Sequence, residues 1–316
     1  MRVKTLKNLD LLLHWGLGKQ NTTYPLAHPP EEELLSIPLL ELTNFSHDYG
    51  YFSLTRPLVG EVSSSKKDLE IALDILHSLY KNQVKGSTLQ LATAEILTKI
   101  IAYRDLQLGQ TLSIPFQTDT QLALETFTVD HIFDIWNGMP AFGLTSPHSS
   151  LLLFRGTDFS HLNKRAIASL LSDLDLAGPG LQAFNNARPT LHSWLKQMHS
   201  QGKPAQVMGF SLGGALAAYT YIYEHPLLSS SPSISICAPG VTPAVAQHYT
   251  QLHPITPFIS YINAGDPISK VGTLFGTVYC LSAPTPLKPL SAHTALMCAT
   301  PLVHKTRVLT APPPSK

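Results

Sequence analysis

The stretch best suited to chemistry is residues 209–215, which read Gly-Phe-Ser-Leu-Gly-Gly-Ala. A short apolar run at 205–208 comes before it, and a proline-free run with several alanines, Leu212–Glu224, follows it. A serine between a strand and a helix in Gly-x-Ser-x-Gly lies on a sharp turn, where the glycines avoid the clash that side chains would cause. This pattern predicts Ser211 as a nucleophile. The alternative is a glycine-rich strand-to-helix turn that carries an idle serine.

A nucleophile of this kind works with a carboxylate and a histidine that follow it in the chain, in that order. Only Glu224 and Asp266 supply carboxylates after Ser211. Glu224 ends the predicted helix, 13 residues (224 − 211) and roughly 20 Å from the serine, so it is excluded. Asp266 comes just after a predicted strand at 258–263, where catalytic groups gather in open α/β sheets. We therefore predict Asp266 as the acid, the alternative being a turn former in Gly-Asp-Pro.

Two histidines, His293 and His304, follow Asp266. His293 comes after a proline-rich loop at 284–289 and opens an apolar run at 294–298 that is typical of a helix. A loop lets a base reach the serine, and a helix holds the base in place. His304 lies near the end of the chain and is interpreted as a surface residue. We predict His293 as the general base.

Acyl transfer also needs two backbone donors that stabilise an oxyanion. The first is predicted at Leu212, because this residue follows the nucleophile and begins a helix whose dipole favours negative charge there. The second is predicted in the loop at Gly156 and Thr157, directly after a predicted strand at 151–154. Arg155 in the same loop is interpreted as a partner in a structural ion pair.

Four segments of the chain together resemble the class 3, or fungal-type, lipases. Their order and rough spacing agree with that family across about residues 140 to 300, whereas residues before about 120 match nothing in it. The family's usual Gly-His-Ser is Gly-Phe-Ser here, and the 27 residues (293 − 266) from acid to histidine are a short gap for it. The matching segments are 154–157 (Phe-Arg-Gly-Thr), 209–214 (Gly-Phe-Ser-Leu-Gly-Gly), 237–241 (Cys-Ala-Pro-Gly-Val) and 263–267 (Asn-Ala-Gly-Asp-Pro).

This resemblance implies an α/β-hydrolase fold and a carboxylic ester hydrolase that acts on acylglycerols or phospholipids. It also implies that Thr157 supplies the second oxyanion donor and that a lid follows it in the chain. Residues 158–174 would form this lid, since they carry an amphipathic pattern. The alternative is a helix that packs into the core. The apolar positions of the stripe are Ile167, Leu170, Leu171 and Leu174.

The elements that must position these residues alternate between strands and helices after residue 140, which predicts an α/β fold with a mostly parallel sheet. We predict an irregular extension over residues 1–65 and a hydrolase domain over 66–312. Helices are expected at 67–80, 87–103, 128–136 and 188–199. Strands are expected at 141–145 and 150–154, as a hairpin, and at 233–238, 258–263 and 276–281.

Composition limits the function classes. The 316 residues carry a net charge of +1 and only 14% charged residues, which argues against nucleic acid as a partner and suits contact with apolar material. We expect a lipid or acyl ester substrate, transient contact with a lipid surface, no cofactor, no metal and no transmembrane segment. The cysteines, Cys237, Cys280 and Cys298, are interpreted as core residues rather than disulfide partners.

Location and reaction stay open at this level. A cleavable signal peptide is not evident, so the protein is expected in the cytoplasm or to be secreted by a route without one. A lipid acyltransferase or a thioesterase could use the same triad, because the acyl acceptor depends on how water is excluded. A non-catalytic lipid-binding or interaction protein with a hydrolase fold is the alternative from another class.

Overall fold

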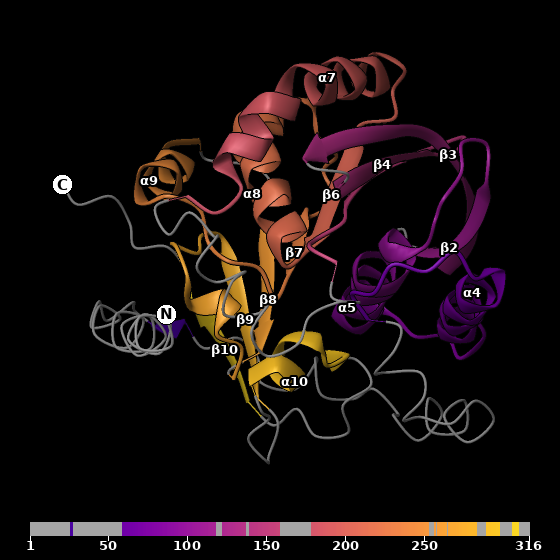
Figure 1. Cartoon of the computed structure of the whole chain (residues 1–316), viewed down its shortest axis with the longest axis horizontal. Helices are drawn as coiled ribbons and strands as arrows, with labels where there is room; N and C mark the ends of the chain where they lie inside the picture. Colours follow the sequence, from indigo (N-terminus) through magenta and orange to yellow (C-terminus); the bar gives the residue numbers. More distant parts are fainter. Residues whose placement is uncertain are drawn as a thin grey trace, which may run out of the picture.

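In the described part of the chain, ten strands form one sheet, around which the helices of this computed structural model are arranged (Figure 1). The structure describes residues 26–27, 59–117, 122–136, 139–158, 178–252, 256, 258–263, 265–282, 289–297 and 305–309. The strands are β1 (Leu26–Ala27), β2 (Thr111–Gln117), β3 (Leu122–Trp136), β4 (Met139–Thr145), β5 (Ser150–Phe154), β6 (Ala205–Phe210), β7 (Ile234–Ile236), β8 (Ile259–Asn263), β9 (Thr277–Ser282) and β10 (Lys305–Leu309).

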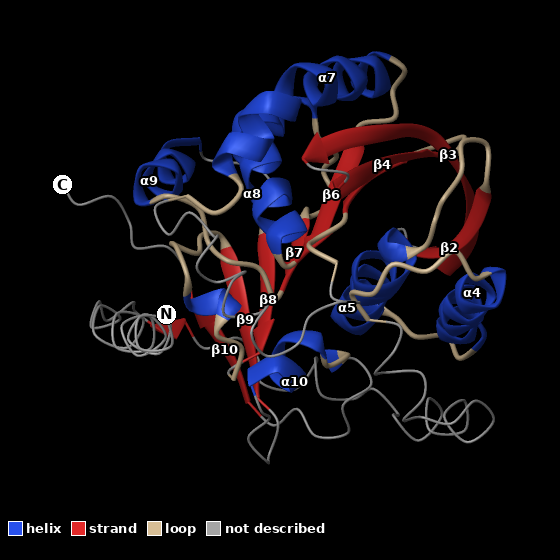
Figure 2. Cartoon of the chain, in the orientation of Figure 1, coloured by secondary structure: helices blue, strands red, loops and turns tan. Residues whose placement is uncertain are grey.

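Helices cover both faces of this sheet (Figure 2). They are α4 (Lys66–Lys81), α5 (Gly86–Glu95), the π-helix η1 (Ile96–Ile100), the 3₁₀-helix η2 (Ile101–Tyr103), α7 (Leu181–Ser200), α8 (Leu212–Glu224), η3 (His225–Leu227), α9 (Pro243–Leu252), η4 (Ile268–Lys270) and α10 (Pro289–Thr294). Helix α8 packs against β5, β6 and β7 with α7 and α9 beside it, whereas α4, α5 and η1 lie on the other face.

The middle of the sheet is parallel. Strands β5 to β9 pair side by side in parallel, and the strands outside them pair antiparallel. Parallel neighbours need crossover connections, which α8 provides between β6 and β7 and α9 provides between β7 and β8. The predicted fold class, a mostly parallel central sheet flanked by helices, is thus confirmed at its centre. The full order is β1-β10-β9-β8-β7-β6-β5-β4-β3-β2.

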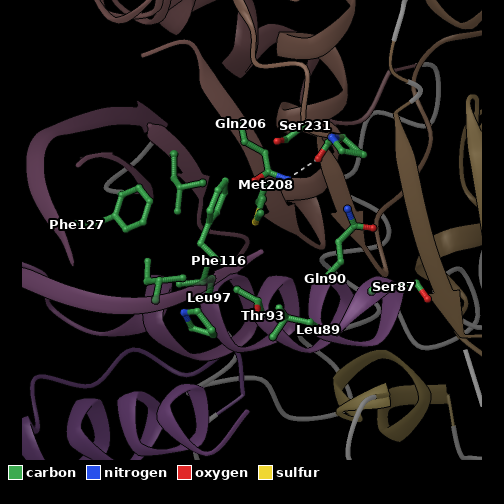
Figure 3. Close-up of a pocket in the computed structure, with 15 residues that line it drawn as sticks. Ser87, Leu89, Gln90, Thr93, Leu97, Phe116, Phe127, Gln206, Met208 and Ser231 are labelled. Atoms are coloured by element: carbon green, nitrogen blue, oxygen red, sulfur yellow. Dashed lines mark hydrogen bonds between the residues drawn. The ribbon is translucent and has the colours of Figure 1, made fainter. Parts of the chain in front are cut away.

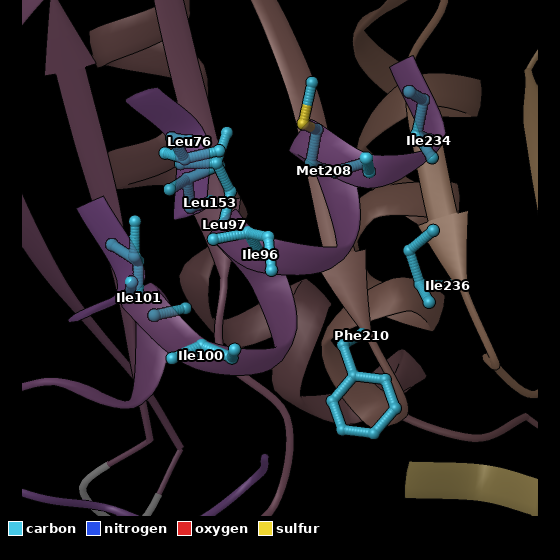
Figure 4. Packing of buried hydrophobic residues seen from close by; sticks show 14 of the residues in the cluster. Leu76, Ile96, Leu97, Ile100, Ile101, Leu153, Met208, Phe210, Ile234 and Ile236 are labelled. Carbon is cyan, nitrogen blue, oxygen red and sulfur yellow. The ribbon is translucent and has the colours of Figure 1, made fainter. Parts of the chain in front are cut away.

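Two hydrophobic cores, one on each face, hold the helices to the sheet. In β5, Leu151 and Leu153 point to the core beneath α4, α5 and η1, while Leu152 and Phe154 point to the core beneath α7 and α8. Figure 4 shows the first core, where Leu153 lies beside residues of η1. Burial on both faces explains why the strand reads as a continuous apolar run.

The prediction of a helix at 128–136 is wrong, because these residues form the second half of β3. A bulge between Val129 and His131 shifts the register against β4. As a result Val129 packs into the core beneath α4 and α5, whereas Phe133 packs into the core beneath α7. The spacing of four between these two residues is typical of a helix, whereas in this strand the inserted residue places them on opposite faces of the sheet.

The remaining expected elements are found with shifted ends. The helix expected at 87–103 is one continuous helical segment that changes from α to π to 3₁₀ form at Glu95 and Ile100. The expected hairpin is β4 and β5, with Thr145 opposite Ser150.

Apart from Leu26–Ala27, residues 1–58 lie outside the described part, so the proposed domain division stays a prediction. No described helix has the length and apolar character needed to cross a membrane.

Candidate active site

Ser211 lies on the sharp turn between β6 and α8. Its backbone has φ 55° and ψ −129°, an unusual conformation for a residue with a side chain. A Cβ atom at Gly209 would overlap the Gly213 carbonyl group, and one at Gly213 would lie 2.5 Å from the Phe154 carbonyl oxygen. Both glycines are therefore required by close backbone approach, as the spacing of the motif predicts.

The structure brings the three predicted side chains Ser211, Asp266 and His293 together. The Nε2 atom of His293 lies 3.0 Å from the Oγ atom of Ser211, and its Nδ1 atom lies 2.9 Å from the Oδ2 atom of Asp266. All three residues are buried. Both distances are those of hydrogen bonds, so the imidazole bridges the hydroxyl and the carboxylate.

Asp266 follows β8, at the carboxyl end of the parallel strands. Its Oδ1 atom accepts a hydrogen bond of 2.9 Å from the Ile268 backbone N–H, and its Oδ2 atom accepts one of 2.7 Å from the Ser269 hydroxyl. These bonds fix the carboxylate so that Oδ2 points at His293. The tight turn and the contact with the histidine therefore use the same side chain, and the two interpretations of Asp266 are compatible.

His293 lies near the end of α10, which differs from the expectation that it opens a helix over 294–298. The helix comes before the histidine because Pro289 begins it with a preset φ angle. The ring of His293 stacks on that of Phe210, with centroids 4.9 Å apart and an interplanar angle of 30°. Residues 159–174 of the expected lid and His304 lie outside the described part of the chain.

The loop at Gly156 and Thr157 lies beside Ser211. A Cβ atom at Gly156 would lie 2.5 Å from the Phe210 carbonyl oxygen and 3.1 Å from the Ser211 Cβ atom, so the close approach to the Phe210 backbone requires glycine. The Tyr103 hydroxyl donates a hydrogen bond of 3.2 Å to the Thr157 carbonyl oxygen. Leu212 is the first residue of α8 and directly follows the serine. The roles of Leu212 and Thr157 as oxyanion donors stay a prediction.

Tyr103 was not predicted from the sequence, although it holds this loop. Its side chain is fully buried at the end of η2, and burial raises its pKa, so it stays a neutral donor. Burial lowers the pKa of Arg155 in the same loop, and the nearby Tyr103, Asp158 and Asp105 oppose this change. A single tyrosine in an apolar helix carries no spacing pattern that would have identified it.

Glu224, the carboxylate excluded by distance, has a separate role. It is buried at the end of α8, where its two oxygens contact Arg188 Nε and His192 Nδ1 at 2.7 Å each. These contacts join α8 to α7, on the face of the sheet away from α5. Glu224 is therefore a structural residue that links two helices.

One cavity lies apart from the three buried side chains. It has a volume of about 530 Å³ and lies between α5, β2, β3 and the amino ends of β5 and β6 (Figure 3). Leu151 and Gln206, near the starts of their strands, line it, whereas Ser211 follows the carboxyl end of β6. Among the described residues, no cluster of histidine, cysteine or carboxylate side chains could hold a metal ion.

Comparisons with known proteins give little beyond this geometry. No family model matches the chain, and no curated protein does. Among solved structures, a triacylglycerol lipase from Penicillium expansum has a TM-score of 0.39 and 18% identity, covering 50% of this chain and 70% of that one. A likeness this distant carries no argument about this chain. The resemblance to class 3 lipases therefore stays a prediction.

Proposed function

We propose that this protein is a serine hydrolase of carboxylic esters, with Ser211 as nucleophile, His293 as general base and Asp266 as the acid that orients it. The observation that carries this proposal is the line of two hydrogen bonds, 3.0 Å and 2.9 Å, that joins the three side chains. The same order and connection of groups defines the Ser-His-Asp triad.

In the proposed reaction, Ser211 Oγ attacks the ester carbonyl carbon while His293 Nε2 takes the hydroxyl proton. The carbonyl oxygen becomes an oxyanion, which the backbone N–H groups of Leu212 and Thr157 stabilise. Collapse of this intermediate breaks the ester C–O bond, and His293 gives its proton to the leaving alcohol. Water then attacks the acyl-enzyme with the same base, which releases the acid and restores the serine.

Asp266 keeps the imidazole in the required tautomer throughout. Its Oδ2 atom accepts the Nδ1–H hydrogen bond, which leaves Nε2 free of a proton and directed at the serine. Its negative charge also stabilises the imidazolium that forms in each step. The bonds from Ile268 and Ser269 hold the carboxylate in place, so little reorganisation is needed during the reaction.

For the substrate we propose a lipid ester, either an acylglycerol or a phospholipid. The low charged content of 14% favours contact with apolar material, and the class 3 lipase motifs imply acyl esters. The chemistry derived above needs no cofactor, because nucleophile, base and oxyanion donors all come from the chain.

A fluorophosphonate probe tests the nucleophile directly. We expect the probe to modify Ser211 and the protein to hydrolyse p-nitrophenyl esters in a chain-length screen. Ser211→Ala should lose labelling and on the order of a millionfold in kcat, by comparison with other serine triads. Ser230→Ala, at an exposed serine, is the matched control and should behave as wild type. An unlabelled, inactive wild-type protein would favour the non-catalytic lipid-binding function instead.

A further inference from the structure

A buried ion pair lies on the helical segment behind the site. Lys99 Nζ lies 2.7 Å from Glu95 Oε1, and neither side chain has any exposed surface. Glu95 ends α5 and Lys99 belongs to the π-helix η1 that continues it. Neither residue has a part in the chemistry derived above. A pair removed from water in this way loses the hydration of both ions and seldom adds net stability over apolar residues of similar volume.

Both charged groups also bind the backbone just after His293. Lys99 Nζ donates a hydrogen bond of 2.6 Å to the Ala295 carbonyl oxygen. Glu95 Oε1 accepts one of 2.9 Å from the Met297 backbone N–H. Lys99 and Ala295 are 196 positions apart in the chain, and Glu95 and Met297 are 202 positions apart. The ion pair is therefore a link between the α5–η1 segment and the end of α10.

Lys99 also approaches His293 through the ring of Phe210. Lys99 Nζ lies 5.4 Å from the centroid of the Phe210 ring, within the range of a cation–π contact. The imidazole of His293 stacks on the same ring with centroids 4.9 Å apart, and the ring of Tyr103 also meets it edge-on at 6.3 Å. Figure 4 shows Phe210 at the end of its strand, near the η1 residues Ile96 and Ile100.

The local helix form fits this arrangement. The chain changes from α-helix to π-helix at Glu95, and such wide turns occur frequently at functional sites. Residues 283–288 and 298–304, on either side of α10 and its end, lie outside the described part of the chain. The contacts of His293 and of the ion pair both act on the end of α10, where Leu296 and Met297 also pack into the core beneath α4 and α5.

We propose that Glu95 and Lys99 are positioning residues, which hold the segment 293–297 so that His293 Nε2 stays within hydrogen-bond distance of Ser211 Oγ. This inference rests on the proposed function, since it assigns a role to residues that act through its base. Loss of the pair lets this segment move relative to the serine. A displacement of about 1 Å at a reacting group can lower the rate roughly a hundredfold.

The test is the double variant Glu95→Gln/Lys99→Met, which removes the Ala295 contact without leaving an unpaired buried charge. On a short soluble ester we expect kcat of the folded fraction to fall about tenfold to a hundredfold, with KM unchanged. Hydrogen–deuterium exchange should speed up in residues 289–297 and stay unchanged in α8. The single variant Lys99→Met loses the same Ala295 contact and also removes the cation beside the Glu95 carboxylate, so it should lose as much kcat as the double variant and more thermal stability.

The matched control is Arg188→Met/Glu224→Gln, which removes another buried carboxylate and its cation, at the far end of α8. It should lower the melting temperature but leave kcat of the folded fraction unchanged. If Lys99→Met and the double variant lose only thermal stability and keep wild-type kcat and exchange, the pair is structural and the proposal is overturned. Failure of the proposed function gives a different result, because the wild-type protein itself would then neither hydrolyse esters nor react with the fluorophosphonate. The exchange measurement would still test whether the ion pair holds residues 289–297.

Discussion

The Nε2 atom of His293 lies 3.0 Å from the Oγ atom of Ser211, although 82 residues separate the two in the chain. The serine is held in the β6–α8 turn, where its backbone has an unusual positive φ of 55°. The histidine has no comparable strand to hold it, since α10 is only six residues long. Its position therefore depends on side-chain contacts, chiefly with Asp266 and Phe210.

Replacing His293 and Asp266 should have unequal effects. We expect His293→Ala to be as damaging as loss of the nucleophile, because it removes the proton acceptor. Asp266→Asn should cost roughly 10⁴-fold in kcat, since it leaves the imidazole in the wrong tautomer but keeps it in place. Steady-state kinetics with a p-nitrophenyl ester measure both. His304→Ala is the control and should be nearly silent; an inactive His304→Ala with an active His293→Ala would reverse the assignment of the base.

Removing the Tyr103 hydroxyl should loosen the loop that carries Thr157. Tyr103→Phe loses the 3.2 Å bond to the Thr157 carbonyl oxygen, and we expect kcat to fall about tenfold with an unfolding free energy lower by about 1 kcal/mol. Tyr261→Phe is the matched control, because it also loses one buried tyrosine hydrogen bond, to Gln90 Oε1, but at a distance from the loop. Equal kcat values for the two variants would contradict the role of Tyr103.

The lid expected at 158–174 can be tested by Leu170→Asp. A lid would bind lipid through its apolar stripe, which favours the interface by about 25 cal/mol per Å². The variant should then lose activity on emulsified esters far more than on short soluble ones, with little change in melting temperature. A core helix would instead bury an unpaired carboxylate and lose several kcal/mol of stability. A large drop in melting temperature with equal loss on both substrates would support the core helix.

The thiol of Cys237 should be unreactive in the folded protein. Burial raises its pKa to about 12 from an ordinary value of 9.0, so almost no thiolate exists at pH 8. We expect iodoacetamide to leave Cys237 unmodified in a Cys280→Ser/Cys298→Ser background until guanidinium unfolds the chain, as mass spectrometry can detect. Between about pH 9 and pH 12 the folded thiol keeps its proton, whereas the thiol of the unfolded chain loses it. The contribution of Cys237 to the free energy of unfolding should therefore decline as pH rises through this range. Rapid native labelling would contradict its burial.

Much of the site could be predicted because its parts are marked locally. The glycines around Ser211 are required by contacts within one strand–turn–helix unit, which a short motif specifies. Asp266 could be found by elimination, since only two carboxylates follow the serine and helix length excludes Glu224. Strands β5 and β6 were evident because both of their faces are buried, which makes them continuously apolar.

Tertiary structure alone decided the rest, because the deciding contacts join residues far apart in the chain. Val129 and Phe133 have the spacing of a helix, and only pairing with β4 and its bulge makes them part of a strand. Glu95 and Lys99 are four residues apart, as in many exposed helical ion pairs. Packing of residues 295–297 against them buries both charges, so no property of their own segment could show that they reach the neighbourhood of His293.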